Sequence, residues 1–384
     1  MRRIVIIGSG LAGYGVAREL RKLDREARIT LVTRDAGDFY AKPSLSNALA
    51  AGKAADALVT TPAGTICAQL DLTLMARTTV EGIDRQAREV LTSGGRLPYT
   101  GLVLATGADP VRLPIGGDGA GAVLQVNDLD DYRRFREAIA GASRIAILGA
   151  GLIGSEFAND LLASGLRVSV IDPAPRPLAA LLPEPAGRWF ASRLAAAGVE
   201  WRFGDAVESV AEADRGSVLS LRGGARLEAD AVLCAVGLRP RTTLASAAGL
   251  RIDRGIVVDE YAATSDPAIF AIGDCAQYGA RLLPYVQPIM TAARAIAATL
   301  AGTPTPVRFG PMPVIVKTPA CPAVILPPSD DGGEWLASSD GDGMEMRYVD
   351  ADERLRGFVL LGSAASRRAE LLRQVAAPQG IAAA

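Results

Sequence analysis

Histidine is absent from this 384-residue sequence. Without histidine the chain can form no Ser-His-Asp or Cys-His catalytic relay, no His-ligated metal site and no His proton shuttle. We therefore expect any catalysis to depend on other side chains or on a bound cofactor.

Cysteine is scarce as well. The four cysteines, Cys67, Cys234, Cys275 and Cys321, lie far apart in the sequence. No close pair is present that could chelate zinc, hold an iron–sulfur cluster or exchange disulfides. The spacing therefore predicts no metal site and four reduced, buried cysteines.

A charge excess of one sign and long apolar runs are also missing. The chain has 41 Lys+Arg against 42 Asp+Glu, a net charge of -1, which argues against a nucleic-acid binder or a polybasic membrane anchor. No apolar stretch is long enough to cross a bilayer. Residues 1–16 imitate a signal peptide, but charged, helix-like sequence follows them. We expect a soluble cytoplasmic protein that acts as a monomer.

Two glycine-rich segments each lie between a predicted strand and a predicted helix. The first is Gly8-Ser9-Gly10-Leu11-Ala12-Gly13 and the second is Gly149-Ala150-Gly151-Leu152-Ile153-Gly154. In such a segment the first glycine permits a tight turn, the second admits a pyrophosphate and the third lets helix and strand pack closely. The phosphate then binds the free amides at the helix start. One match alone would be weak, but two in this context predict two dinucleotide sites.

In each of the two dinucleotide units, an acidic residue at the end of the second predicted strand is expected to select the nucleotide. Asp172 ends the strand-like run 168–171, and a carboxylate there accepts hydrogen bonds from a free ribose 2'-hydroxyl and repels a 2'-phosphate. This favours NAD over NADP, although Arg176 lies close enough to weaken the inference. The alternative for Asp172 is a solvated acid at a strand-to-proline turn.

The first dinucleotide unit departs from this pattern. Its second strand ends in Thr33, Arg34 and Asp35, so the acid is displaced from the usual place, and we assign Thr33 and Arg34 to the first nucleotide. A later strand-like run, 269–272, delivers Asp274 at its carboxyl end, where ligands lie in doubly wound sheets. Asp274 is a candidate acceptor for polyol hydroxyls, with a helix-capping aspartate as the alternative.

We call the glycine-rich segment 8–13 the first cradle and the segment 149–154 the second cradle. Together they predict an α/β fold with two doubly wound nucleotide-binding domains. Similar apolar runs at 102–108 and 231–240 suggest where the chain crosses between them, which makes the second domain an insertion in the first. Strand-like runs and a helical segment at 364–375, with an acidic glycine-rich loop at 329–343, indicate a small C-terminal α+β domain. The predicted domains are 1–108 with 238–312, 109–237, and 313–384.

Taken in order, these segments resemble the glutathione-reductase type of FAD- and NAD(P)-dependent pyridine nucleotide reductases. The resemblance covers the whole chain and rests on the two cradles, Ala105-Thr106-Gly107, Glu156, Val236 to Pro240, and Ile272-Gly273-Asp274. Within that family the segments 40–46, 156–160, 237–241 and 310–322 look like those of rubredoxin reductases. Flavorubredoxin reductases of nitric oxide detoxification are similar over many of these segments, and less so around 317–328.

The resemblance implies FAD at the first cradle, NADH at the second, and further residues beside the flavin nucleotide. Glu156 would lie near the flavin and the nicotinamide path, with a helix-start acid as the alternative. The residues that the resemblance assigns to FAD outside the first cradle are Thr33, Arg34, Lys42, Val80, Thr106, Glu156, Asp274, Val286 and Lys317. Those assigned to NAD are Gly149, Gly151, Gly154 and Asp172.

The departures from the family are informative too. Disulfide reductases of this fold carry a redox cysteine pair where this chain has Lys42, Ser44 and Ser46, and their His-Glu acid/base pair is impossible here. We therefore expect no covalent nucleophile, with hydride entering the flavin and single electrons leaving it. The resemblance implies that the hydride comes from NADH and that the electrons go to rubredoxin, a small acidic iron protein, in support of a downstream oxygenase such as an alkane hydroxylase or an oxygen-detoxifying oxidase. The alternatives are a flavorubredoxin reductase and a non-catalytic FAD/NAD redox sensor. An NADH oxidase is disfavoured by the missing cysteine.

Overall fold

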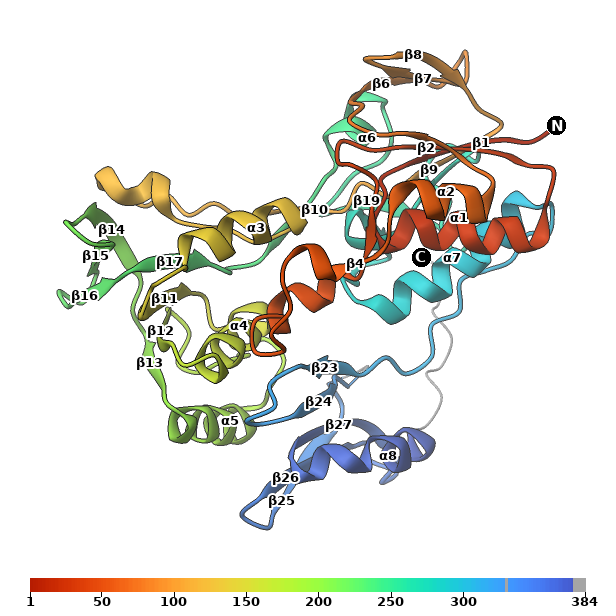
Figure 1. Ribbon diagram of the computed structural model, residues 1–384. Helices are drawn as coiled ribbons and strands as arrows, with labels where there is room; N and C mark the ends of the chain where they lie inside the picture. The colour runs from red at the N-terminus through yellow and green to blue at the C-terminus, as the bar shows by residue number, and fades with distance from the viewer. Residues whose placement is uncertain (329–330, 376–384) are drawn as a thin grey trace.

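The computed structural model describes residues 1–328 and 331–375; the last nine residues of the predicted C-terminal domain, 376–384, lie outside this range. The chain forms two parallel-sheet units and a third, antiparallel unit (Figure 1). The predicted α/β fold with a small C-terminal α+β unit is confirmed. No helix in the described part of the chain is long and apolar enough to cross a membrane.

The first unit is built on a five-stranded parallel sheet in the order β20-β9-β1-β2-β5. Helices α1 and α7 pack against each other beside this sheet (Figure 1), and α7 begins at Val286 as predicted. The elements are β1 (Arg3–Ile7), β2 (Arg28–Val32), β5 (Thr73–Met75), β9 (Gly101–Leu104), β20 (Ile269–Ala271), α1 (Leu11–Leu23), α2 (Ala63–Leu70) and α7 (Val286–Leu300).

Smaller elements complete the first unit. A three-stranded antiparallel sheet carries β6 (Val80–Asp84), β7 (Glu89–Thr92) and β8 (Gly95–Pro98), and a second three-stranded sheet carries β19 (Ile256–Val258), β21 (Ala276–Tyr278) and β22 (Arg281–Leu282). The remaining elements are β3 (Phe39–Tyr40), β4 (Val59–Thr61) and α6 (Thr243–Ala247).

Arg21 links the segment that follows α1 to the carboxyl end of α2. Its guanidinium donates five hydrogen bonds of 2.7–3.2 Å to the backbone carbonyls of residues 24, 25, 27, 70 and 71. Helix ends leave carbonyls without intrahelical partners, and a planar guanidinium can satisfy several of them at once. One side chain therefore holds the α1–β2 connection and the end of α2 together.

Replacing Arg21 by lysine should lower the free energy of unfolding by about 2 kcal/mol, because an ammonium has fewer donors and lacks the planar fork. Urea unfolding would measure the change. The matched control is Lys22→Gln, since Lys22 is exposed and pairs with Glu19 on the surface, and its cost should stay below about 0.5 kcal/mol. Equal costs for the two variants would contradict the role assigned to Arg21.

The second unit has a four-stranded parallel sheet in the order β13-β12-β11-β17 and an antiparallel sheet in the order β14-β15-β16. Both glycine cradles thus lie in equivalent places, after the first strand of a parallel sheet. The elements are β11 (Arg144–Leu148), β12 (Arg167–Asp172), β13 (Val199–Phe203), β14 (Val207–Glu212), β15 (Ser217–Leu221), β16 (Arg226–Ala229), β17 (Ala231–Cys234), α3 (Leu129–Ala138), α4 (Leu152–Ala163) and α5 (Glu184–Ala197).

The chain passes between the first two units along a two-stranded ribbon. Strand β10 (Ala108–Pro110) leaves the first unit and pairs antiparallel with β18 (Leu238–Pro240), which returns to it. The guanidinium of Arg241 bonds the Asp109 carboxylate at 2.6 Å and the Thr106 carbonyl at 2.9 Å. The segment that leaves the first unit and the segment that returns to it therefore lie side by side.

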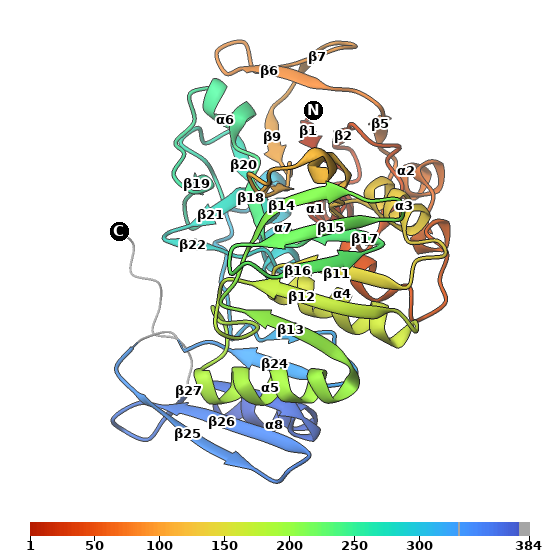
Figure 2. The same ribbon diagram turned by 90° about the vertical axis from the view of Figure 1, so that its left-hand side faces the viewer.

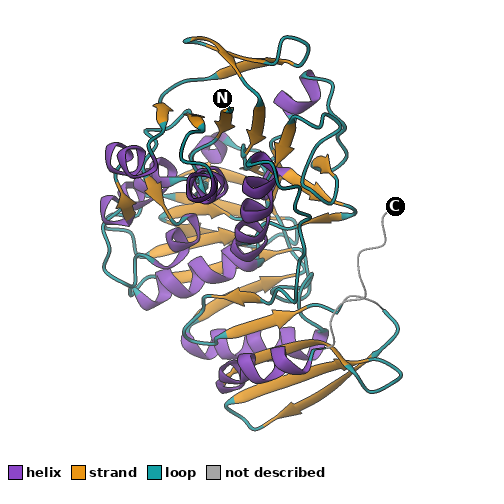
Figure 3. Cartoon of the chain, turned by 90° about the vertical axis from the view of Figure 1, so that its right-hand side faces the viewer, coloured by secondary structure: helices purple, strands orange, loops and turns teal. Residues whose placement is uncertain are grey.

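The third unit is a five-stranded antiparallel sheet in the order β23-β24-β27-β26-β25. It lies at the opposite end of the molecule from the β6–β8 sheet (Figures 2 and 3). Its elements are β23 (Val314–Val316), β24 (Ala323–Leu326), β25 (Glu334–Ser339), β26 (Gly343–Val349), β27 (Leu355–Gly362) and α8 (Arg368–Gln374).

Two sequence expectations for the third unit were wrong. Strand β25 lies inside the predicted loop at 329–343; it is an exposed edge strand with no apolar alternation, formed by pairing with β26. The predicted helix at 364–375 divides into a 3-10 turn, Ser363–Arg367, and α8. That turn packs against β26 and β27, a tertiary contact without a local sequence signal.

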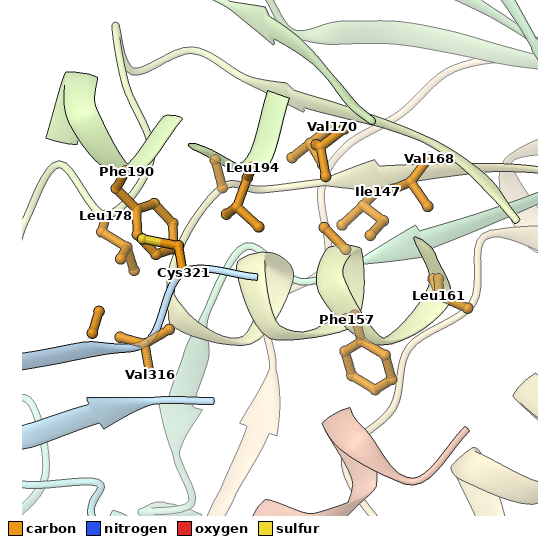
Figure 4. Packing of buried hydrophobic residues seen from close by; sticks show 14 of the residues in the cluster. Ile147, Phe157, Leu161, Val168, Val170, Leu178, Phe190, Leu194, Val316 and Cys321 are labelled. Atoms are coloured by element: carbon orange, nitrogen blue, oxygen red, sulfur yellow. The ribbon is translucent and has the colours of Figure 1, made fainter. Parts of the chain in front are cut away.

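The largest apolar core joins the second and third units. Ile147 lies on the sheet side of α4, and Phe157 points away from that sheet to pack against Phe135 of α3, with ring centroids 5.5 Å apart; Val316 and Cys321 of the third unit complete the cluster (Figure 4). A closely packed core of this kind fixes the relative position of its parts. Helix α4 is therefore held rigidly between the units that flank it.

The cysteines differ in part from expectation. Cys234, Cys275 and Cys321 are buried, but Cys67 is partly exposed on α2. Burial raises the pKa of the Cys321 thiol to about 11 and also raises that of Cys67. Nucleophilic cysteines need a lowered pKa, so neither thiol has the environment of a reactive one.

Candidate functional site

The first cradle has the geometry of a dinucleotide-binding turn. A side chain at Gly8 would place its Cβ 2.2 Å from the Ala105 carbonyl oxygen, and one at Gly13 would place it 1.9 Å from the Gly8 carbonyl oxygen. At Gly10 a Cβ would meet no atom of the described chain within 4 Å. The outer two glycines are thus required by packing, and the middle one leaves open space beside the free amides of Leu11 and Ala12 at the start of α1.

The second cradle repeats this geometry. A Cβ at Gly154 would lie 1.9 Å from the Gly149 carbonyl oxygen, and one at Gly149 would lie 2.8 Å from the Ala235 carbonyl oxygen. At Gly151 the described residues leave the space open, with nothing within 4 Å. Both cradles therefore fit a pyrophosphate at the middle glycine.

Asp35, which lies three residues beyond the end of β2, contacts the first cradle. The hydroxyl of Ser9 lies 2.8 and 2.9 Å from the two Asp35 carboxylate oxygens, and the hydroxyl of Thr33 donates to Asp35 at 2.9 Å. Arg34 is exposed beside this group. Our candidate set omitted Asp35, although its residue type and nearness to Thr33 could have marked it.

Asp172 lies at the equivalent place in the second unit. Its carboxylate accepts hydrogen bonds from the backbone N–H of Ala150, at 2.6 Å, and of Ala174, at 2.7 Å. The first of these amides belongs to the cradle itself. The acid is thus held against the turn that would bind the pyrophosphate, where a ribose would follow.

A second polar group joins Lys42 to Asp274. Lys42 opens a 3-10 helix, Lys42–Asn47, and its ammonium donates to the Asn127 side-chain oxygen at 2.7 Å. It lies 3.8 Å from the carboxylate of Asp274, which follows β20. Burial lowers the pKa of Lys42, and the Asp274 charge opposes that shift. Asn127 was not predicted, because only the fold brings it to Lys42.

The remaining predicted residues lie around the first unit. Gly273, next to Asp274, packs against Ala12 of the first cradle. The Thr106 hydroxyl donates to the Arg241 carbonyl at 3.1 Å. Val80 starts β6, and two residues earlier the backbone N–H of Thr78 donates to the Thr33 carbonyl at 2.9 Å. Val286, at the start of α7, is 41% exposed, which leaves its side chain accessible to a ligand.

A buried ion pair forms where the three units meet. Glu156 on α4 has a fully buried side chain, and its carboxylate lies 2.5 Å from the Lys317 ammonium. The backbone N–H of Lys317 donates to Oε1 of Glu156 at 2.9 Å. The Ser46 hydroxyl donates at 2.5 Å to Oε2, the oxygen that also faces the Lys317 ammonium. Lys317 also donates to the Pro43 carbonyl at 2.6 Å. Ser46 was not among our candidates, since its partner is 110 residues away.

Two neighbouring side chains of α4 strengthen this junction. The Asp160 carboxylate accepts the backbone N–H groups of Leu49 and Ala50 at 3.1 and 2.9 Å, and the Asn159 side-chain oxygen accepts that of Ala320 at 3.0 Å. Because Asp160 is buried, its pKa is raised. Helix α4 is therefore hydrogen-bonded both to the segment that follows Lys42 and to the segment that follows Lys317.

The chain is similar to known proteins over nearly its whole length. The family model described as pyridine nucleotide-disulphide oxidoreductase matches residues 2–299, and the one described as rubredoxin binding C-terminal domain matches residues 306–375. The Rubredoxin-NAD(+) reductase of Acinetobacter baylyi is 45% identical, with 96% of each chain covered. The Nitric oxide reductase FlRd-NAD(+) reductase of Aeromonas hydrophila is 41% identical, over 97% of this chain and 96% of that one.

A solved structure agrees with this match. The reductase chain in the covalent putidaredoxin reductase–putidaredoxin complex superimposes with a TM-score of 0.88 at 29% identity, covering 97% of this chain and 91% of that one. The family match spans both glycine cradles and the junction residues Ser46 and Glu156. The protein therefore belongs to the pyridine nucleotide-disulphide oxidoreductase family.

Proposed function

We propose that this protein is an FAD-dependent reductase that takes hydride from NADH and passes electrons one at a time to rubredoxin. The observation that carries the proposal is the union of two dinucleotide cradles with a C-terminal unit that matches a rubredoxin-binding family. Relatives named Rubredoxin-NAD(+) reductase, at 43–45% identity over nearly the whole chain, support it.

The described side chains fit the two cofactors at separate cradles. FAD would lie at the first cradle, with its adenosine end near Thr33, Arg34 and Val80 and the rest of the nucleotide reaching toward Thr106, Asp274 and Val286. NADH would lie at the second, with Asp172 on its ribose. The open space at Gly10 and Gly151 and the helix starts behind them suit two pyrophosphates.

FAD, when bound, supplies the conversion of a hydride into single electrons. The protein itself holds, orients and shields the reacting groups. Glu156 fixes the Lys317 ammonium, and Asn127 fixes that of Lys42, so both positive charges are in place before a cofactor binds. Preorganised charge of this kind stabilises developing negative charge without reorganisation.

We also propose a division of the chain into three domains: 1–108 with 238–312 for FAD, 109–237 for NADH and 313–384 for the C-terminal domain. The antiparallel pairing of β10 with β18 supports the first two boundaries. The C-terminal domain would present the electron acceptor's docking surface, in keeping with its family match. The protein is expected to work as a cytoplasmic monomer without nucleic-acid or membrane partners.

A stopped-flow experiment with the FAD-loaded protein, NADH and rubredoxin tests the proposal directly. We expect NADH to bleach the flavin absorbance and rubredoxin to restore it, with thiol alkylation leaving the rate unchanged. Bound FAD with negligible turnover on every acceptor would identify a redox sensor instead. Oxygen consumption equal to NADH loss without an acceptor would identify an oxidase.

The second candidate is a flavorubredoxin reductase, which the 41% identity to the Aeromonas hydrophila relative favours. Purified rubredoxin and flavorubredoxin, compared as acceptors under the same conditions, separate the two functions. A higher kcat/KM with flavorubredoxin would make that protein, rather than rubredoxin, the preferred electron acceptor.

The pH profile should report on Lys42. Because burial lowers its pKa, the ammonium loses its charge at a lower pH than an ordinary lysine as the solution becomes alkaline, and NADH-dependent turnover should fall with it. Lys42→Arg keeps the charge and should move this fall to higher pH, even if the rate at neutral pH is lower. The control is Lys53→Arg, at an exposed lysine. If NADH-dependent turnover falls at the same alkaline pH in both variants, Lys42 has no part in the mechanism.

A further inference from the structure

One arginine beside the second cradle packs against a helix and, in the described part of the chain, forms no ion pair with Asp172. Arg176 lies four residues after Asp172, in the loop between β12 and α5, where an arginine could bind the 2'-phosphate of NADPH. Its side chain instead lies against Gly187 in the first turn of α5: a Cβ at that glycine would be 2.6 Å from the Arg176 Cδ and 3.0 Å from its Nε. Only a residue without a side chain leaves room for the arginine there.

The loop itself leaves Arg176 little backbone freedom. Pro175 and Pro177 flank it, and a residue before proline is restricted to extended conformations. Just beyond, the Leu178 N–H donates to the Ala150 carbonyl at 2.9 Å, so the loop is tied to the cradle at both Asp172 and Leu178. The position of Arg176 therefore depends mainly on where its side chain can fit.

The guanidinium is weakly held in this place. Among the described residues the guanidinium makes one hydrogen bond, to the Leu182 carbonyl at 3.3 Å, and its buried Nε has no partner. In residues 1–328 and 331–375 it forms no ion pair within 4.0 Å. Packing over Gly187, rather than a strong polar partner, keeps it there.

We propose that Gly187 is a specificity-determining residue: it lets Arg176 fold onto α5, away from the ribose, and so leaves Asp172 to select NADH over NADPH. A Cβ at position 187 displaces the flexible end of Arg176 rather than backbone. The Asp172 charge then attracts the released guanidinium toward the ribose, where it can bind a 2'-phosphate. The inference rests on the proposed use of NADH.

The test is Gly187→Ala, measured by calorimetric titration of the FAD-loaded protein with NAD+ and with NADP+. Gly187 is buried in a helix and has no positive φ, so alanine fits the backbone and favours the helix. We expect the ratio of the NADP+ to the NAD+ dissociation constant to fall at least about tenfold, the effect of one charge-assisted hydrogen bond. Gly64→Ala, in an α2 position with open space around the Cβ, is the matched control and should leave the ratio unchanged.

Adding Arg176→Gln to Gly187→Ala should restore the original ratio. An unchanged ratio in folded Gly187→Ala, or weaker NADP+ binding when Arg176→Gln is introduced into the original protein, would overturn the inference. Reduction of the bound flavin by NADH is recorded in parallel on the original protein. Its absence would refute the proposed donor, whereas its presence with an unchanged ratio would refute only the role of Gly187.

Discussion

Gly10→Ala should abolish FAD binding and leave the protein folded, whereas Gly13→Ala should also destabilise the fold. At Gly10 the added methyl group enters the open space in which the pyrophosphate would lie, so it competes only with the ligand. At Gly13 it would lie 1.9 Å from a backbone oxygen, and backbone of β1 or α1 has to move. We expect a cost of more than about 3 kcal/mol at Gly13, at the upper end of overpacking effects.

Flavin absorbance of the purified variants and thermal unfolding of the FAD-free proteins separate the two effects. Gly64→Ala again serves as the control, with FAD bound and stability equal or slightly higher. The second cradle gives an internal comparison: Gly151→Ala should keep FAD and lose NADH-dependent reduction. Normal FAD content in Gly10→Ala would show that the first cradle does not hold the cofactor.

Lys317→Met should be strongly destabilising, by about 3–5 kcal/mol, because it leaves the fully buried carboxylate of Glu156 without its counter-charge. The hydrogen bonds from Ser46 and from the backbone N–H of residue 317 would remain, but neither neutralises the carboxylate. The FAD-free protein should show the loss in urea unfolding, which keeps the measurement independent of any cofactor.

The double variant Glu156→Gln with Lys317→Met provides the control. It removes both charges, so most of the lost stability should return, because an uncharged pair needs no compensation in the protein interior. NADH-dependent rubredoxin reduction should nevertheless stay low, since the Lys317 ammonium that we propose to lie near the flavin is gone. A double variant as unstable as Lys317→Met alone would falsify the ion pair as the cause.

The features that the sequence predicted are those encoded by neighbouring residues. Each cradle depends on one strand, one turn and one helix, and the start of α7 at Val286 and the acid at Asp172 follow from similar local patterns. Ser46, Asn127 and the partners of Asp160 escaped prediction because each acts across a distance of many residues. Strand β25 escaped it because an exposed edge strand is defined by its neighbour rather than by apolar alternation.

The resemblance to a family supplied what local pattern could not. Lys42 and Lys317 carry no distinctive signal of their own, and only the matching segments singled them out among the lysines. The structure then shows that each has a fixed polar partner, Asn127 for the first and Glu156 for the second. The position of Arg176 over Gly187 lay beyond both approaches, since it depends on the packing of one loop against one helix.

The order of strands in the first sheet affects how the protein is made. Strand β20 pairs with β9, yet residues 105–268 lie between them, and closing so long an open chain is entropically costly. Once the second unit has folded, the β10–β18 ribbon brings its two ends together. The length of open chain that must close between β9 and β20 then becomes short. During synthesis the parallel sheet of the second unit should therefore be completed before that of the first, and a chain stopped before residue 269 should bind NAD+ but not FAD.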